Sequence, residues 1–94
     1  MNLRKVARGQ ECQVRLPGVC NWDPQTTILA HLPGGGMGRK QHDLIGAWSC
    51  SDCHDAVDRR NYRHLDYEYV RTAHLEGMAR TLLCLVERGV FDAL

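Results

Sequence analysis

The most regular pattern of apolar and polar positions lies in the last third of the chain. Apolar or partly apolar side chains recur there at steps of three and four residues, at Tyr67, Val70, His74, Met78, Leu82 and Leu85. This spacing predicts an amphipathic helix whose apolar stripe packs against the rest of the protein. Asp66 is a suitable N-cap, Glu68 lies in the first turn, and Gly89 stands where a C-terminal cap is expected. We therefore predict a long helix that follows Asp66 and ends near Arg88.

Two shorter runs, at residues 26–32 and 44–48, are rich in β-forming residues and predict strands. The first would end at Pro33, where a glycine-rich segment with too much backbone freedom for a regular element begins. Ser51 and Asp52 favour the start of a short helix that runs to about residue 58. The sequence thus predicts an α+β fold, in which a ββα unit precedes the long helix.

Length and composition narrow the class of protein. Ninety-four residues fit one domain, over residues 1–94, and exclude a two-domain enzyme. An apolar fraction of 44% with 24% charged residues is typical of a globular protein. No apolar run approaches the roughly 20 residues of a membrane span, and the basic start lacks the apolar stretch of a signal peptide. We therefore expect a soluble protein of the cytoplasm, with no membrane partner.

The five cysteines indicate a metal site. Four of them form two groups, Cys12 with Cys20 and Cys50 with Cys53, while Cys84 stands alone. In a reducing compartment clustered cysteines hold a metal more often than they form disulfides. Four thiolates satisfy Zn²⁺ in a closed tetrahedral site, which is structural and not catalytic. We therefore predict a structural Zn²⁺ held by the two pairs, which a small core needs; buried free cysteines are the alternative. The first pair brackets a Pro17-Gly18 turn, which is typical of a knuckle or a hairpin.

A histidine closes the first predicted strand, and another directly follows the second cysteine pair. The order is a strand ending near His31, a glycine-rich loop, a second strand, and then Cys50-x2-Cys53 followed by His54 on a helix. This order resembles the HNH endonuclease, or ββα-metal, motif over about residues 12–60. The resemblance implies that His31 is the general base and that His54 binds a catalytic divalent ion.

Two further segments are distinctive, the opening LRKVARGQECQVRLPGVCN and the later LEGMART. With them, the chain over its whole length is similar to the YbcO-like nucleases of lambdoid phages and prophages. This similarity implies an endonuclease that acts on DNA in a bacterial host cell.

The chain departs from the HNH pattern at two positions. Many HNH enzymes have an Asp or His ligand immediately before the general base, where this chain has Ala30. The Asn in the middle of the motif is best matched by Asp43, next to His42. A carboxylate at this position can orient the His31 ring by accepting a hydrogen bond from it. We therefore place Asp43 with His31 in the catalytic site.

Hydrolysis of a phosphodiester needs a group that deprotonates water and a cation that offsets the charge developing on the phosphate oxygens. Asp58 follows His54 by four residues, which places the two side chains on one face of a helix. We expect this pair to hold the catalytic ion, for which Mg²⁺, Mn²⁺, Ni²⁺ and Zn²⁺ are candidates. Asp55 is the alternative carboxylate, and His64 is a further candidate without a spacing rule behind it.

Charge is unevenly distributed along the chain. Residues 1–40 carry six basic and two acidic side chains, whereas residues 41–94 carry six basic and nine acidic ones. Because the formal net charge is only +1, local basic groups and not a long-range field must contact nucleic acid. The expected contacts are Arg39, Lys40, Arg59 and Arg60. The glycine run before Arg39 lacks the spacing of a P-loop and is not a nucleotide site.

Three functions remain open on these grounds. The first is a metal-dependent endonuclease that hydrolyses DNA. The second is a non-catalytic zinc module that binds DNA or a phage recombination or replication protein, which the missing ligand at Ala30 and the modest charge favour. The third is an interaction domain in which the long helix mediates self-association. We expect Cys84, Trp22, Trp48 and His74 to be packing residues.

Overall fold

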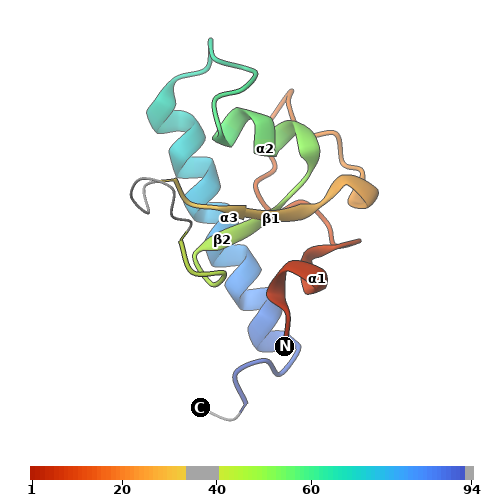
Figure 1. The fold of residues 1–94 in the computed structure, drawn as a ribbon. Coiled ribbons are helices and arrows are strands. Elements are labelled where there is room, and N and C mark those ends of the chain that lie inside the picture. The colour runs from red at the N-terminus through yellow and green to blue at the C-terminus, as the bar shows by residue number, and fades with distance from the viewer. Residues whose placement is uncertain (34–40, 93–94) are drawn as a thin grey trace.

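The computed structural model describes residues 1–33 and 41–92. Its elements are, in chain order, α1 (Leu3–Ala7), a 3-10 turn η1 (Pro24–Thr26), β1 (Ile28–His31), β2 (Gly46–Ser49), α2 (Ser51–Val57) and α3 (Tyr67–Glu87). Figure 1 shows α3 passing behind the two-stranded sheet, with α2 and α1 on the near side toward opposite ends of the molecule. The predicted α+β fold with two strands and a long C-terminal helix is confirmed.

The two strands pair antiparallel, and the pairing sets the position of His31. Ala30 lies opposite Ala47, and His31 lies opposite Gly46 at the end of the sheet. The first strand begins two residues later than predicted because Asp23 caps η1 and its carboxylate accepts from the backbone N–H of Gln25. All four residues of β2 are buried, and its Trp48 carbonyl accepts from Gln13 N–H at 2.8 Å. The segment that follows Cys12 therefore runs along the second edge of β2.

The helix α2 begins immediately after β2, close to the predicted start. Cys50 is its N-cap, and the Cys50 Sγ accepts from the backbone N–H of Cys53 at 3.4 Å. Asp58, predicted to be the last helical residue, is the C-cap. The turn from β2 into α2 therefore places the second cysteine pair at the helix N-terminus and His54 directly after Cys53.

The long helix α3 has the predicted ends, with Asp66 as N-cap and Gly89 at a φ of 78° just beyond it. Its predicted apolar stripe is wrong at two positions, because Tyr67 and Leu82 are 51% and 37% exposed. The buried face consists of Val70, His74, Gly77, Thr81 and Leu85. Small and hydrogen-bonding residues occupy this face because α3 lies close to the backbone of its neighbours. Thr81 Oγ1, for example, accepts from the Trp48 backbone N–H at 3.0 Å.

The one-and-a-half-turn helix α1 was not predicted from the polar start of the chain. Asn2 caps it, and Ala7 is fully buried in a cluster with Leu29, Trp48 and Leu85. A segment of five residues is too short for an apolar period to be recognised. The helix joins the amino terminus to the sheet and to the C-terminal half of α3.

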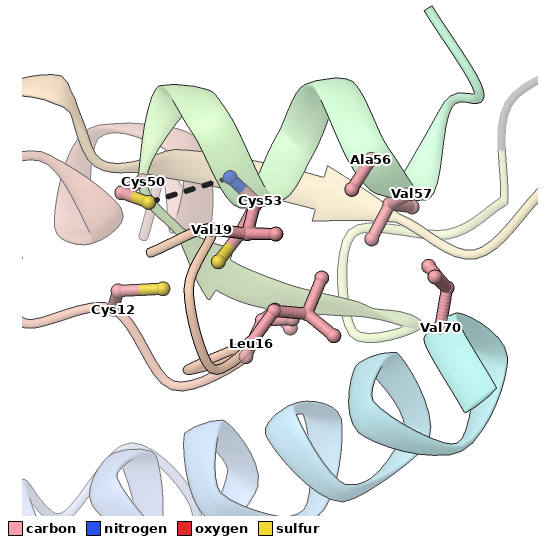
Figure 2. Close-up of a cluster of buried hydrophobic side chains, with 10 residues drawn as sticks. Cys12, Leu16, Val19, Cys50, Cys53, Ala56, Val57 and Val70 are labelled. Atoms are coloured by element: carbon pink, nitrogen blue, oxygen red, sulfur yellow. Dashed lines mark hydrogen bonds between the residues drawn. The ribbon is translucent and has the colours of Figure 1, made fainter. Parts of the chain in front are cut away.

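A second core cluster surrounds the cysteines. Figure 2 shows Cys12, Cys50 and Cys53 beside Leu16 and other apolar side chains of α2, α3 and the segment 12–20, which we call the knuckle.

The two tryptophans differ in their surroundings. Trp48 is buried, as predicted, whereas the prediction that Trp22 packs in the core is wrong because its side chain is 64% exposed. Within the described residues no helix is both long enough and apolar enough to span a membrane.

Candidate functional site

The four clustered cysteines converge on one point between the knuckle and the start of α2. One Sγ from each of Cys12, Cys20, Cys50 and Cys53 lies within 4.8 Å of all the others. The Sγ atoms of Cys20 and Cys50 are 3.8 Å apart. Zn–S bonds of about 2.3 Å in a tetrahedron place neighbouring sulfurs about 3.8 Å apart. The donor set and its spacing therefore fit a single Zn²⁺.

Backbone N–H groups surround the sulfurs and favour thiolates. A hydrogen bond from the Cys53 thiol is the main reason that the pKa of Cys12 is lowered to about 4. The backbone N–H groups of Arg15, Cys50 and Val14 also donate to Cys12 and lower its pKa further. Burial, followed by the nearby charges of Cys12 and Cys50, raises the pKa of Cys20 to about 12. The pKa of Cys53 is also raised, mainly because its thiol donates to Cys12. Without a cation the cluster therefore retains protons, which a bound metal would displace.

Two residues, one in the knuckle and one just after it, have left-handed backbone conformations. Arg15 and Trp22 both have a φ of 55°, and the backbone N–H groups of these residues point to Cys12 and Cys20 respectively. Neither residue is a glycine, so the sequence contained no signal for these bends. The seven-residue spacing between Cys12 and Cys20 is accommodated by a turn in which Leu16 O accepts from the N–H groups of Val19 and Cys20.

His31 and Asp43 form a hydrogen-bonded pair at the end of the sheet. His31 Nε2 lies 2.8 Å from Asp43 Oδ1, and Arg4 Nε lies 3.2 Å from the same oxygen. The hydrogen bond from His31, aided by Arg4, lowers the pKa of Asp43 below its usual value. An ionised carboxylate only accepts, so Nε2 of His31 carries the proton and a neutral ring keeps Nδ1 as its acceptor.

His54 and Asp58 form a second pair at the end of α2. His54 Nε2 is 3.0 Å from Asp58 Oδ2, as the four-residue spacing predicts. Arg60 NH2 lies 3.3 Å from His54 Nδ1 and 3.5 Å from the same oxygen of Asp58. A guanidinium only donates, so His54 Nδ1 accepts and the ring is neutral. Burial lowers the pKa of His54 and outweighs the opposing effect of Asp58.

The two histidine–carboxylate pairs involve elements that contact each other, since His31 ends β1, His54 lies in α2, and α2 packs against β1. The charge of His31 contributes to the lowered pKa of His54, which places both rings within electrostatic reach of each other. His74, on α3, contacts β1, and its Nε2 is 2.9 Å from the Ala30 carbonyl. The prediction that His74 packs in the core is confirmed, since it is 1% exposed. β1, α2 and α3 therefore contact one another.

The remaining predicted residues have varied surroundings. Asp55, the alternative carboxylate, accepts a hydrogen bond from Arg60 Nε. Arg59 NH2 donates to the carbonyls of Arg63 and Leu65, so this side chain braces the loop before α3. His64 is exposed and belongs to neither histidine–carboxylate pair. Arg39 and Lys40 lie outside the described residues.

Two residues near the site carried no specific signal in the sequence. Arg4 reaches Asp43 from a position 39 residues away, and its role depends on the unpredicted helix α1. His42 Nδ1 accepts from the backbone N–H of Leu44 and thereby shapes the turn that carries Asp43. Cys84 is half-buried against the α1 cluster and is not part of the four-cysteine group.

The fold and the site together define a small α+β protein with a four-cysteine cluster and two histidine–carboxylate pairs. The chain belongs to the family described as "Putative nuclease YbcO", whose model matches residues 1–90. Relatives named "Putative nuclease YbcO" from Escherichia coli K12 and "Putative nuclease ybcO" from Enterobacteria phage 82 are each 50% identical to it over 95 aligned positions, covering 98% of both chains.

A solved structure has a similar fold. It is described as a "putative bacteriophage protein" from Escherichia coli K-12, and it is 50% identical to this chain. The two superpose with a TM-score of 0.81 over 94% of this chain and 100% of the other. The names of the family and of the two relatives carry the association with nucleases, whereas the description of the solved structure mentions only a bacteriophage.

Proposed function

We propose that the protein is a metal-dependent endonuclease of the HNH type that hydrolyses DNA. The observation that carries this proposal is the pairing of His31 with Asp43 and of His54 with Asp58, where β1 and α2 contact each other. One pair supplies a group that accepts a proton, and the other supplies a nitrogen and an oxygen ligand for a cation. Phosphodiester hydrolysis requires both functions in one place.

His31 is the general base in this proposal. Asp43 accepts from Nε2–H, which fixes the ring and directs Nδ1 toward the water to be activated. When Nδ1 takes a proton from water, the resulting imidazolium is stabilised by the carboxylate that already contacts the opposite nitrogen. Arg4 Nε donates to the same carboxylate.

His54 and Asp58 are the proposed ligands of the catalytic ion. His54 Nε2 and Asp58 Oδ2 lie 3.0 Å apart, close enough to bind one ion, and binding would move the ring proton from Nε2 to Nδ1 and displace the Arg60 guanidinium from Nδ1. This donor pair therefore fits Mg²⁺, Mn²⁺, Ni²⁺ or Zn²⁺, with the remaining positions left to water and phosphate. When bound, such an ion offsets negative charge on the phosphate and polarises the leaving oxygen.

The four cysteines have a structural role in this proposal. A Zn²⁺ bound by four thiolates has no open position for substrate. It would instead join the knuckle to the start of α2 and thereby fix the position of His54. Arg60, beside His54, and Arg39, Lys40 and Arg59 are the proposed contacts to the nucleic-acid backbone.

The proposal is tested by incubating purified protein with supercoiled plasmid and each of Mg²⁺, Mn²⁺, Ni²⁺ and Zn²⁺. We expect nicking with at least one ion. His31→Ala should lower the rate by about a hundredfold or more while circular dichroism and bound zinc are unchanged. His64→Ala is the matched control, because it removes an exposed imidazole that belongs to neither histidine–carboxylate pair. An intact plasmid under all four conditions, or full activity of His31→Ala, would contradict the proposal.

The second candidate function is a non-catalytic zinc module that binds DNA. It is favoured by Ala30, which leaves the second pair with two ligands, and by the net charge of only +1. Within the described residues, the four cysteines are the group in which three or more metal-binding side chains converge. Salt-dependent binding of DNA without cleavage by any of the four ions would identify this function.

A further inference from the structure

Arg4 connects the amino-terminal helix to the carboxylate of the proposed active site. Its Nε and His31 Nε2 both contact Asp43 Oδ1, at 3.2 and 2.8 Å. The three residues come from α1, the end of β1 and the turn before β2. A single oxygen therefore joins three separate segments of the chain.

We propose that Arg4 is a positioning residue, which holds the Asp43 carboxylate so that His31 keeps the orientation needed to act as a base. This inference rests on the proposed function of His31. It adds Arg4, and with it the helix α1, to the active-site residues between His31 and Asp58 that the HNH resemblance implies.

The surroundings of Arg4 support a positioning role. Asn2 Oδ1 accepts from the backbone N–H groups of Arg4 and Lys5, which fixes the start of α1. Ala7 at the other end is fully buried against the sheet, and α1 contacts β1 directly. The Arg4 side chain thus starts from an anchored backbone. Its hydrogen bond and positive charge both help lower the pKa of Asp43, after the larger effect of His31.

An alternative role is direct contact with the substrate, because the Arg4 side chain is 55% exposed. The two roles have different kinetic consequences. Loss of a positioning residue lowers kcat because the base is misaligned, whereas loss of a phosphate contact raises KM and reduces the salt dependence of binding.

The first test needs no substrate. The titration of the Asp43 carboxyl is followed by ¹³C NMR in the wild type, Arg4→Gln, Arg4→Lys and Lys5→Gln. We expect the midpoint to rise in Arg4→Gln and to be partly restored in Arg4→Lys. Lys5→Gln removes the next positive charge of α1 and should match the wild type. An unchanged midpoint in Arg4→Gln would overturn the inference.

The second test measures plasmid cleavage by the same four proteins. Arg4→Gln should lower kcat by about tenfold with KM within about twofold of the wild type, and Arg4→Lys should recover part of the loss. A raised KM with unchanged kcat would show that Arg4 binds phosphate and would overturn the positioning role. If the wild type cleaves nothing, the proposed nuclease function fails, while the carboxyl titration still decides whether Arg4 controls Asp43.

Discussion

His74 is an ionisable side chain that the fold keeps neutral. It is 1% exposed, and its Nε2–H donates to the Ala30 carbonyl in β1. Burial lowers the pKa of His74, while Ala30 and Asp58 act in the opposite direction and His54 and Arg71 lower it further. The unfolded chain can protonate this ring at a pH at which the folded protein cannot.

The consequence is a loss of stability in acid. A lowered pKa in the folded state means that the contribution of His74 is fully present above the unfolded pKa of about 6.5 and is lost as pH falls below it. Gln can replace the hydrogen bond but does not titrate. We therefore expect the difference in free energy of unfolding between the wild type and His74→Gln to shrink between pH 7 and pH 5, measured by urea denaturation. A constant difference would contradict this account.

The candidate site residues differ in how far the sequence could predict them. The contact between His54 and Asp58 follows from local helix geometry, because residues four apart lie on one face. The contact between His31 and Asp43 spans twelve residues and was expected only through the HNH resemblance. Arg4 had no such support, since its contact requires both α1 and the packing of α1 on the sheet.

At the scale of elements, α3 shows how packing changes the meaning of a sequence pattern. Its ends are determined by Asp66 and Gly89, which act locally, and were predicted. Its buried face was predicted only in part, because Gly77 contributes no side chain to an apolar stripe. A Cβ at Gly77 would lie 3.0 Å from Gln13 O and 3.0 Å from Val14 Cα. The glycine is therefore the point at which the helix approaches the knuckle.

Gly77→Ala tests this close approach. Helix propensity alone predicts that the change stabilises the protein by up to about 1 kcal/mol. The contact with the backbone of residues 13 and 14 predicts the opposite, with overpacking that costs about 1–3 kcal/mol. We expect a net loss of stability in chemical denaturation. Glu76→Ala, at the adjacent exposed position, should change stability by no more than about 0.5 kcal/mol. A stabilised Gly77→Ala variant would show that the knuckle can move away.

For the whole molecule, the cysteine cluster joins segments that are distant in sequence. Cys12 and Cys20 precede the sheet, whereas Cys50 and Cys53 belong to the start of α2 that follows it. The core around them is small, and several of its members are the cysteines themselves. A metal bound there would stabilise the fold by an amount on the order of 10 kcal/mol.

Zinc content and its removal test this link. We expect about one zinc per chain in untagged protein and a large fall in Tm on treatment with a chelator at neutral pH. Cys20→Ala, at the half-buried end of the cluster, should lose the zinc and much of the stability. Cys84→Ala should retain the zinc, because Cys84 lies outside the cluster. Protein without zinc that is as stable as the zinc-bound form would refute the structural role.

The sequence by itself determined the features that depend on near neighbours. Caps, the turn into α2, the spacing of His54 and Asp58, and the ends of α3 follow from interactions within a few residues. The tertiary structure decided which residues meet across the chain. It brought Arg4 to Asp43 and left Trp22 exposed. On α3 it left Tyr67 and Leu82 exposed and placed Gly77 against the backbone of a neighbouring segment. These outcomes depend on how whole elements pack, and a local pattern of apolar and polar residues does not contain that information.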